Sequence, residues 1–380
     1  MLQYLYDRQH RHATWLELFF DLVFVAVLGV VAHDLAYTHE GHISLEQLLK
    51  FALVFIPVWW IWMGHTLFAN IYDRDDRQHR VITLLIMACI VVLSIFSKKV
   101  LAGDFVWFVL VYFVIRLFIA GLYLLELASG QPHHRAIILP KAGMITVGAM
   151  ISLSAVWLPD NYKYLLFYGG ILLDMLGQLW IRKSNKRHSK TDLRHFVERM
   201  GLLSIIILGE SVIVMVASLP EATGDSRGIF SAAVSFVLLG AVWWIYFDSF
   251  PMLERARRLV SGNVLIYSHL LLCTGLLILA NLIQHAILND LDRATFSLFA
   301  ISGLSLFYLG KQIPYWVGFP PWRLRILLNT VICIGCTVFS VLLADIAQAL
   351  IGMTVGMLVY VWMTLRYVVT VDVSEYLLKE

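Results

Sequence analysis

The stretch that decides the fold lies at residues 14–36 and reads TWLELFFDLVFVAVLGVVAHDLA. As a helix it can cross the roughly 30 Å hydrocarbon core of a bilayer, which takes about 20 apolar residues. The rest of the chain shares this composition: of 380 residues, 60% are hydrophobic and 14% are charged, and the mean hydropathy is +0.77. Soluble domains have about 45–50% apolar and about 25% charged residues. The sequence therefore predicts an integral membrane protein and argues against a soluble enzyme or a nucleic-acid-binding protein.

Further apolar stretches of this length follow, separated by proline, glycine and charged residues. The twelve predicted spans are 14–36, 46–71, 80–97, 104–128, 136–158, 162–181, 195–219, 228–250, 263–287, 294–312, 322–343 and 347–371. No connection between them is long enough to fold as a soluble domain. We therefore expect an all-α, polytopic membrane protein.

The basic residues predict how the chain is oriented. An even number of spans places both termini on one side, and a cytoplasmic placement puts most of the 29 Lys and Arg residues in cytoplasmic segments. Membrane proteins carry this excess in their cytoplasmic loops. The first apolar run is too long for a cleavable signal and contains Glu17 and Asp21. We expect it to stay in the protein as the first span.

An internal similarity predicts a duplication. The second span contains PVWWIWMGH and the eighth contains AVWWIYFDS, which aligns Trp59 with Trp243. We therefore predict two six-helix repeats, 1–181 and 182–380. Since six is even, both repeats enter the membrane from the same side, as parallel repeats related by an axis along the membrane normal. Chance similarity between tryptophan-rich spans is the alternative.

Five ionisable residues at the openings of the two repeats are the candidate functional residues. Glu17 and Asp21 are four residues apart and share one helix face. Glu198 and Arg199 begin the seventh span, and Glu210 lies deeper in it. Placing an ionisable group at the bilayer centre costs about 2.5–3.5 kcal/mol on insertion scales. Such a group is therefore expected only where another group compensates its charge or where the function requires it. We predict that these residues line a transport path or binding site, and charges that only fix helix packing are the alternative.

Other polar residues within the predicted spans are possible partners for these charges. They are His65, Arg116, Asp174, Asp248 and His269. Arg116 and Asp174 lie mid-membrane in the same half, and we expect them to pair as a structural contact. A single histidine such as His269 is more typical of packing than of ligand binding.

The sequence predicts no catalytic residue, no metal site and no cofactor. The four cysteines lie inside apolar runs, and the Walker A, HExxH and GxSxG motifs are absent. Whether the protein is an enzyme stays open, with a non-enzymatic role favoured.

The segments TWLELFFDLVFVAVLG and ERMGLLSIIILGESV resemble the bacterial low temperature requirement A protein family. They open the two halves, so the resemblance covers essentially the whole chain. Met200 stands where the family motif, ERFGL, has Phe. The resemblance implies a polytopic protein of the bacterial inner membrane and no defined biochemical activity.

The segment LFFDLVF is also similar, more weakly, to the Phe-Ser-Asp signature of endolysosomal potassium channels, which have two six-helix repeats. Phe20 stands at the Ser position, and Leu202 stands where the second repeat would carry Asp. This similarity implies a pore or transport path near the repeat axis.

The leading prediction is a transporter or channel for a small solute or cation, with proton coupling as an option. An integral-membrane enzyme acting on a lipid-like or quinone-like substrate, or a structural or stress-response membrane protein, are the alternatives. The expected partners are membrane lipids and the transported solute or ion, and no nucleic acid. The sequence leaves open whether copies associate as a homo-oligomer.

Overall fold

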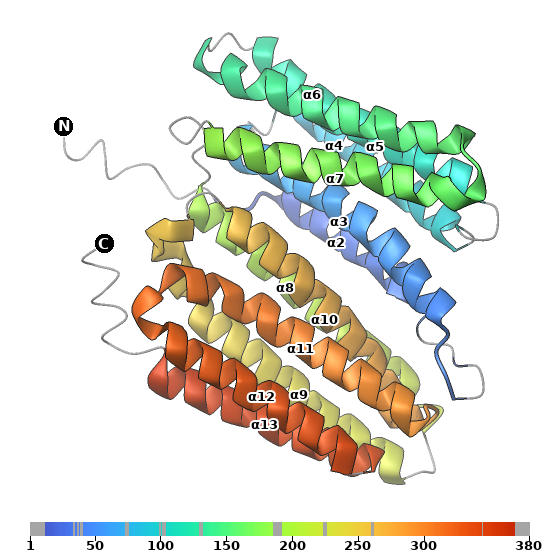
Figure 1. Ribbon diagram of the computed structural model, residues 1–380, viewed down its shortest axis with the longest axis vertical. Helices are drawn as coiled ribbons and strands as arrows, with labels where there is room; N and C mark the ends of the chain where they lie inside the picture. Colours follow the sequence, from blue (N-terminus) through green and yellow to red (C-terminus); the bar gives the residue numbers. More distant parts are fainter. Residues whose placement is uncertain are drawn as a thin grey trace. The chain divides into compact units, whose positions relative to one another are not determined.

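The computed structural model describes residues 12–32, 35, 38, 41–72, 76–98, 100, 104–128, 132–184, 192–222, 226–259, 262–343 and 345–368. Within these ranges the regular structure consists of α-helices and short 3-10 helices, without a β-strand (Figure 1). The N-terminal basic residues and residues 185–191 of the basic connection 182–194 lie outside the described residues.

Twelve of the described helices are long and apolar enough to cross a membrane. They are α2 (Trp15–Ala32), α3 (Leu45–Tyr72), α4 (Arg77–Ser97), α5 (Phe105–Ala128), α6 (Pro132–Ser154), α7 (Asp160–Ser184), α8 (Leu193–Ser218), α9 (Ser226–Ser249), α10 (Asn263–Leu288), α11 (Arg293–Gly318), α12 (Arg323–Leu343) and α13 (Ile346–Tyr367). The short 3-10 helices are η2 (Ala155–Trp157), η3 (Phe250–Arg255), η4 (Arg257–Leu259) and η5 (Pro320–Trp322). The prediction of an all-α, multi-pass membrane protein is confirmed.

Proline inside a helix explains one wrong predicted boundary, that of the tenth span. Pro140 lies inside α6 and Pro314 lies inside α11. Membrane helices tolerate proline because neighbouring groups satisfy the freed backbone carbonyls. The predicted tenth span stops at residue 312, before Pro314, whereas α11 continues to Gly318 and so surrounds Lys311 with helix.

Side-chain caps fix where several helices begin. Before α3, the Ser44 amide donates to Gln47 Oε1 (2.8 Å) and the Gln47 amide donates to Ser44 Oγ (3.2 Å). Asp292 and Asp345 each accept an amide hydrogen at 2.8 Å at the starts of α11 and α13. These contacts satisfy amide groups that have no partner within the helix.

The contacts within the chain divide it into two compact units. Unit 1 comprises Met1–Val31 and Leu49–Arg199, and unit 2 comprises Ala32–Leu48 and Met200–Glu380. In unit 1, α5 packs on α4 and α6, and α6 packs on α7. In unit 2, α9 packs on α10 and α13, and α10, α11, α12 and α13 pack in chain order. The start of α8, as far as Arg199, belongs to unit 1, although the predicted second repeat includes it.

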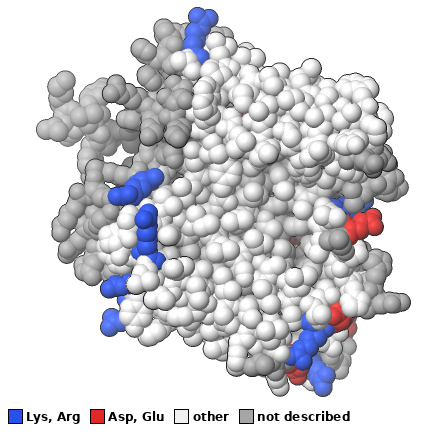
Figure 2. All heavy atoms as spheres, in the orientation of Figure 1, with Lys and Arg blue, Asp and Glu red and all other residues white. Residues whose placement is uncertain are grey.

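Apolar side chains cover the outer surface of the helices. Trp180 of unit 1 and Phe339 of unit 2 are each 66% exposed. On the face shown in Figure 2, charged side chains gather near the ends of the helices, and the surface between them is largely uncharged. This distribution is typical of helices whose middle parts face lipid.

Candidate functional site

Three of the predicted site residues meet in unit 1. Glu17 and Asp21 project from α2, and Arg199 comes from the start of α8. The Nη1 atom of Arg199 lies 2.9 Å from Glu17 Oε1, and its Nη2 atom lies 2.6 Å from Asp21 Oδ1. All three side chains are at most 1% exposed. We call Glu17, Asp21, Arg199 and the neighbouring His195 the acid–base cluster.

The two carboxylates have different further contacts. The Thr14 amide donates to Glu17 Oε2 (2.7 Å) and the Glu17 amide donates to Thr14 Oγ1 (3.2 Å). This reciprocal pair is a capping box that begins α2, so Glu17 also has a structural task. Asp21 Oδ1 accepts a hydrogen bond from Trp62 Nε1 (2.7 Å), but Asp21 Oδ2 is buried and has no hydrogen-bond partner among the described residues. Asp21 therefore has an unused acceptor atom inside the cluster.

The hydrogen bonds around His195 assign its tautomer. The Asp192 amide donates to Asn70 Oδ1 (3.0 Å), and Asn70 Nδ2 donates to the Asp192 carbonyl (2.9 Å). This orients the Asn70 amide so that its nitrogen also faces His195 Nδ1, at 3.0 Å. An amide nitrogen only donates, so His195 Nδ1 accepts and the proton is on Nε2. That Nε2 atom lies 3.3 Å from Glu17 Oε1, so a neutral His195 faces the carboxylate.

The charges of the acid–base cluster do not balance. With His195 neutral, two carboxylates face one guanidinium. Two neighbouring carboxylates in a low-dielectric interior ionise together only when enough cations or donors face them. One proton on a carboxyl group balances the charge of the cluster.

His65 lies on the Phe20 side of α2. The two rings are stacked with their centroids 4.1 Å apart. His65 Nε2 lies 3.2 Å from Thr83 Oγ1, and its Nδ1 atom is buried without a hydrogen-bond partner in the described part of the chain. His65 is thus held by packing in unit 1 and retains one free ring nitrogen.

The structure does not bring Glu198 and Glu210 into the cluster. Glu198 follows Val197 on α8, but its side chain is 34% exposed and lies 3.4 Å from His12 Nδ1. Glu210 belongs to unit 2, is partly exposed and makes no hydrogen bond or ion pair with another described residue. The five predicted residues therefore separate into three that meet and two that do not meet them.

Arg116 and Asp174 form the buried ion pair that the sequence analysis expects. Arg116 Nη2 pairs with Asp174 Oδ2, and Arg116 Nη1 donates to the Trp60 carbonyl (3.2 Å). The Trp60 indole donates to the same Asp174 oxygen at 2.7 Å. Gly64 makes room for this arrangement, because a Cβ atom there would lie 2.7 Å from Arg116 Nη1. The pair has one charge of each sign and links α3, α5 and α7.

The two remaining predicted partners lie in unit 2 and make local contacts. Asp248 is exposed and accepts a hydrogen bond from Trp244 Nε1 (2.9 Å). His269 Nδ1 lies 2.9 Å from the Leu265 carbonyl, so it donates, and Nε2 accepts from the Tyr246 hydroxyl at 3.0 Å. Both residues have structural partners within their own surroundings.

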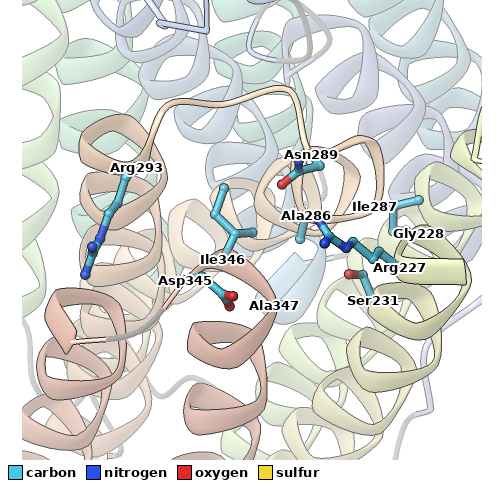
Figure 3. Close-up of a pocket in the computed structure, with 10 residues that line it drawn as sticks. All are labelled: Arg227, Gly228, Ser231, Ala286, Ile287, Asn289, Arg293, Asp345, Ile346 and Ala347. Atoms are coloured by element: carbon cyan, nitrogen blue, oxygen red, sulfur yellow. The ribbon is translucent and has the colours of Figure 1, made fainter. Parts of the chain in front are cut away.

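Unit 2 also contains a pocket of about 450 Å³ at the ends of α9, α10, α11 and α13. Its polar lining residues are Arg227, Ser231, Asn289, Arg293 and Asp345. Figure 3 shows the Arg227 and Arg293 side chains at different edges of the pocket. Arg293 Nη2 donates to the Leu342 carbonyl (2.6 Å). None of the residues that the sequence analysis selected lines this pocket.

The sequence analysis missed His195, Asn70 and Trp62. His195 and Arg199 are four residues apart, so the shared helix face was a signal for His195. No comparable signal exists for Asn70 and Trp62, because their contacts join α3 to other helices. Among the described residues, no group of three or more His, Cys, Asp or Glu side chains is arranged to hold a metal ion.

Comparison with known proteins assigns the family. A sequence model of the bacterial low temperature requirement A protein family matches residues 12–362. A protein of Rhizobium meliloti (strain 1021), described as uncharacterized, is 22% identical over 241 residues. That match covers 62% of this chain and 58% of the relative, which is less than two thirds of the relative's length. Because the family model matches most of its length, the chain belongs to the bacterial low temperature requirement A protein family.

Proposed function

We propose that the protein is a transporter or channel for a small solute or cation in the bacterial inner membrane, and that as a transporter it moves this solute in exchange for protons. The acid–base cluster is its proton-binding site. The observation that supports this proposal is the burial of two carboxylates, Glu17 and Asp21, against one guanidinium, with Asp21 Oδ2 unused. Intramembrane ionisable groups of this kind are typical of proton relays in transporters.

We assign two protonation states to the cluster. When Asp21 Oδ2 holds a proton, Arg199 balances Glu17 alone and the cluster is neutral. When that proton leaves, Arg199 must serve both carboxylates, and a cation nearby becomes favourable. The capping box keeps Glu17 in place in both states, and Trp62 keeps hold of Asp21 Oδ1. Asp21 is therefore the member that we assign to proton exchange.

The surroundings of the cluster suit this role. Glu198 adjoins Arg199 in the chain and is partly exposed, so we assign it to proton entry from water. We keep Glu210 as a proposed path residue of unit 2. The orientation with both termini in the cytoplasm and the arrangement as two parallel repeats belong to the same proposal. The packing order along α4 to α7 and along α10 to α13 supports the repeats.

Proton-coupled flux in vesicles tests the function. The purified full-length protein is placed in vesicles that contain a pH-sensitive dye, and a Na⁺ or K⁺ gradient is imposed. We expect one of these gradients to change the pH inside vesicles that contain the wild type. Asp21→Asn removes the proton-binding oxygen but preserves the size of the side chain and the acceptor for Trp62, so it should abolish the pH change.

Asp248→Asn is the matched control, because it makes the same chemical change at an exposed carboxylate that lies outside the cluster. It should leave the flux unchanged. Equal pH changes for wild type and Asp21→Asn would remove the cluster from the transport path. No pH change with the wild type under either gradient would contradict cation–proton exchange.

A further inference from the structure

A second buried polar group lies in unit 2 around Lys311 of α11. The Lys311 side chain is buried (2% exposed), yet no carboxylate of the described residues forms an ion pair with it. Its Nζ atom lies 4.6 Å from the centre of the Tyr315 ring and 5.3 Å from the centre of the Tyr360 ring. Tyr360 comes from α13, so the ammonium group sits between two helices.

Other polar atoms near Lys311 are also without partners. Both amide atoms of Gln312, the next residue in the chain, are buried and make no hydrogen bond within the described residues. The same is true of the Tyr360 hydroxyl and of Lys311 Nζ itself. Buried polar groups in proteins are nearly always hydrogen-bonded, so a further hydrogen-bond partner is expected for these atoms.

The buried arginines of unit 1 show what a compensated charge requires. Arg199 has Glu17 and Asp21, and Arg116 of α5 has Asp174 of α7. In unit 2, Lys311 of α11 faces α13, and in unit 1, Arg116 of α5 faces α7. Counted from α8, α11 and α13 are the fourth and sixth long helices, as α5 and α7 are when counted from α2. The residue that it meets there is Tyr360, which carries no charge. The helix order is the same, but the counter-charge is missing.

The chemistry of these side chains favours an anion as the missing counter-charge. A buried ammonium group is costly unless it is paired and hydrogen-bonded. Aromatic faces attract a cation but accept no strong hydrogen bond from it. The Lys311 ammonium, the Tyr360 hydroxyl and the Gln312 amide each carry a hydrogen-bond donor. We propose that Lys311, Gln312 and Tyr360 bind a small monovalent anion.

The charge and burial of the site limit the anion. One ammonium group balances one negative charge, so a divalent anion would leave the buried site charged. The three side chains are all at most 4% exposed, so protein would enclose the bound anion, and we expect a halide or a short carboxylate and not a bulky ion. The site is independent of the acid–base cluster, since all its residues belong to unit 2.

Anion-dependent stability of the purified full-length protein tests the proposal. Thermal unfolding is followed at constant ionic strength and pH in sodium salts of chloride, bromide, acetate and gluconate. A ligand that binds the folded state raises the unfolding temperature as its concentration rises. We expect this rise with chloride and bromide for a halide site, or with acetate for a carboxylate site, but not with the bulky gluconate.

Three variants identify the site. Lys311→Met removes the ammonium group and should abolish the anion-dependent shift. Tyr360→Phe keeps the ring and should weaken anion affinity about tenfold, through the loss of one hydrogen bond to a charged group. Lys141→Met is the matched control, because Lys141 is a buried lysine 5.4 Å from the ring of Tyr123 in unit 1. It should keep the full shift.

The outcomes decide the proposal even if Lys311→Met does not fold. Tyr360→Phe then gives the result, and anomalous scattering from crystals grown in bromide should show bromide beside Lys311 Nζ. An unfolding temperature of the wild type that is the same in chloride, bromide, acetate and gluconate would overturn the proposal. So would an unchanged anion affinity in Tyr360→Phe.

Discussion

Arg199 is the residue on which the acid–base cluster depends. It is fully buried and contacts both Glu17 and Asp21, so its loss would leave two buried carboxylates without a cation. Removing one partner of a buried ion pair costs about 3–5 kcal/mol. This cost is independent of the proposed transport role, so measuring it separates the contribution of the cluster to folding from its proposed contribution to transport.

We predict that Arg199→Met lowers the free energy of unfolding by about 3–5 kcal/mol, measured by denaturant unfolding in mixed micelles. The double variant Arg199→Gln with Asp21→Asn should lose less, because it removes a charge of each sign. Glu198→Gln is the control from the same helix turn. Its side chain is 34% exposed, and its effect should stay within about 0.5 kcal/mol. A double variant that is less stable than Arg199→Met would contradict the ion-pair geometry.

From the sequence, site residues can be placed together only when they are a few positions apart in the chain. The four-residue spacing of Glu17 and Asp21 is enough to place them on one helix face. The contact of that face with Arg199 depends on how α2 packs against α8, and the spacing of residues within α2 does not predict this packing. Lys311 shows the opposite problem: it lies next to the predicted end of the tenth span at residue 312, whereas α11 continues past Pro314 and the Lys311 side chain is buried.

At the level of elements, glycines determine how closely α10 and α11 approach. A Cβ atom at Gly275 of α10 would lie 2.6 Å from the Gly303 carbonyl oxygen and 2.6 Å from the Phe307 amide nitrogen of α11. Both are backbone atoms, so only a separation of the helices could relieve the overlap. Small residues at such positions are typical of membrane helix interfaces.

We predict that Gly275→Ala lowers the free energy of unfolding by about 1–3 kcal/mol, because overpacking forces the backbones apart. Gly335→Ala on α12 is the matched control, since a Cβ atom there meets nothing within 4 Å. It should be neutral or stabilising by up to about 1 kcal/mol, because alanine forms helices better than glycine. Equal effects of the two substitutions in the same unfolding assay would show that α10 and α11 are not in close contact at Gly275.

The cap of α11 makes stability depend on pH. The Thr295 side chain, together with the amide groups of Thr295 and Ala294, holds the pKa of Asp292 below its usual value of 3.8. His42 Nδ1 lies 2.7 Å from the same carboxylate. A carboxyl group with a lowered pKa stabilises the folded state above its usual pKa, and this contribution is lost as the pH falls through the lowered value.

Asp292→Ala should therefore cost about 1 kcal/mol at pH 7, through the loss of the cap. The difference from wild type should persist down to about pH 4 and shrink below it. Thermal unfolding of both proteins at several pH values measures this difference. A difference that does not shrink below about pH 4 would contradict the assigned role of the carboxylate.

The elements themselves are well predicted by the sequence. Apolar runs of bilayer length are a strong signal, and all twelve predicted spans correspond to described helices. The errors are at the ends of the helices. The tenth predicted span, for example, ends before Pro314, whereas α11 continues to Gly318. The physical reason is that a proline in a membrane helix has neighbours that satisfy the freed carbonyl groups, whereas the stop rule comes from water-soluble helices.

For the whole molecule, composition and charge predict the environment but not the function. Membership of the bacterial low temperature requirement A protein family and twelve candidate spans follow from the chain as a whole. We propose that the function depends on the few ionisable groups that are buried within the membrane-spanning helices. In unit 1 they form an unbalanced acid–base cluster, and in unit 2 a lysine without a counter-charge.

The central claim is that the acid–base cluster binds and releases a proton. The most direct test is a difference proton titration of purified wild type and Asp21→Asn between about pH 8 and pH 5, a range in which an aspartate in water stays ionised. We predict that the wild type takes up about one proton more per molecule than Asp21→Asn. Identical titration curves would mean that Asp21 neither binds nor releases a proton in this range, and would contradict the account.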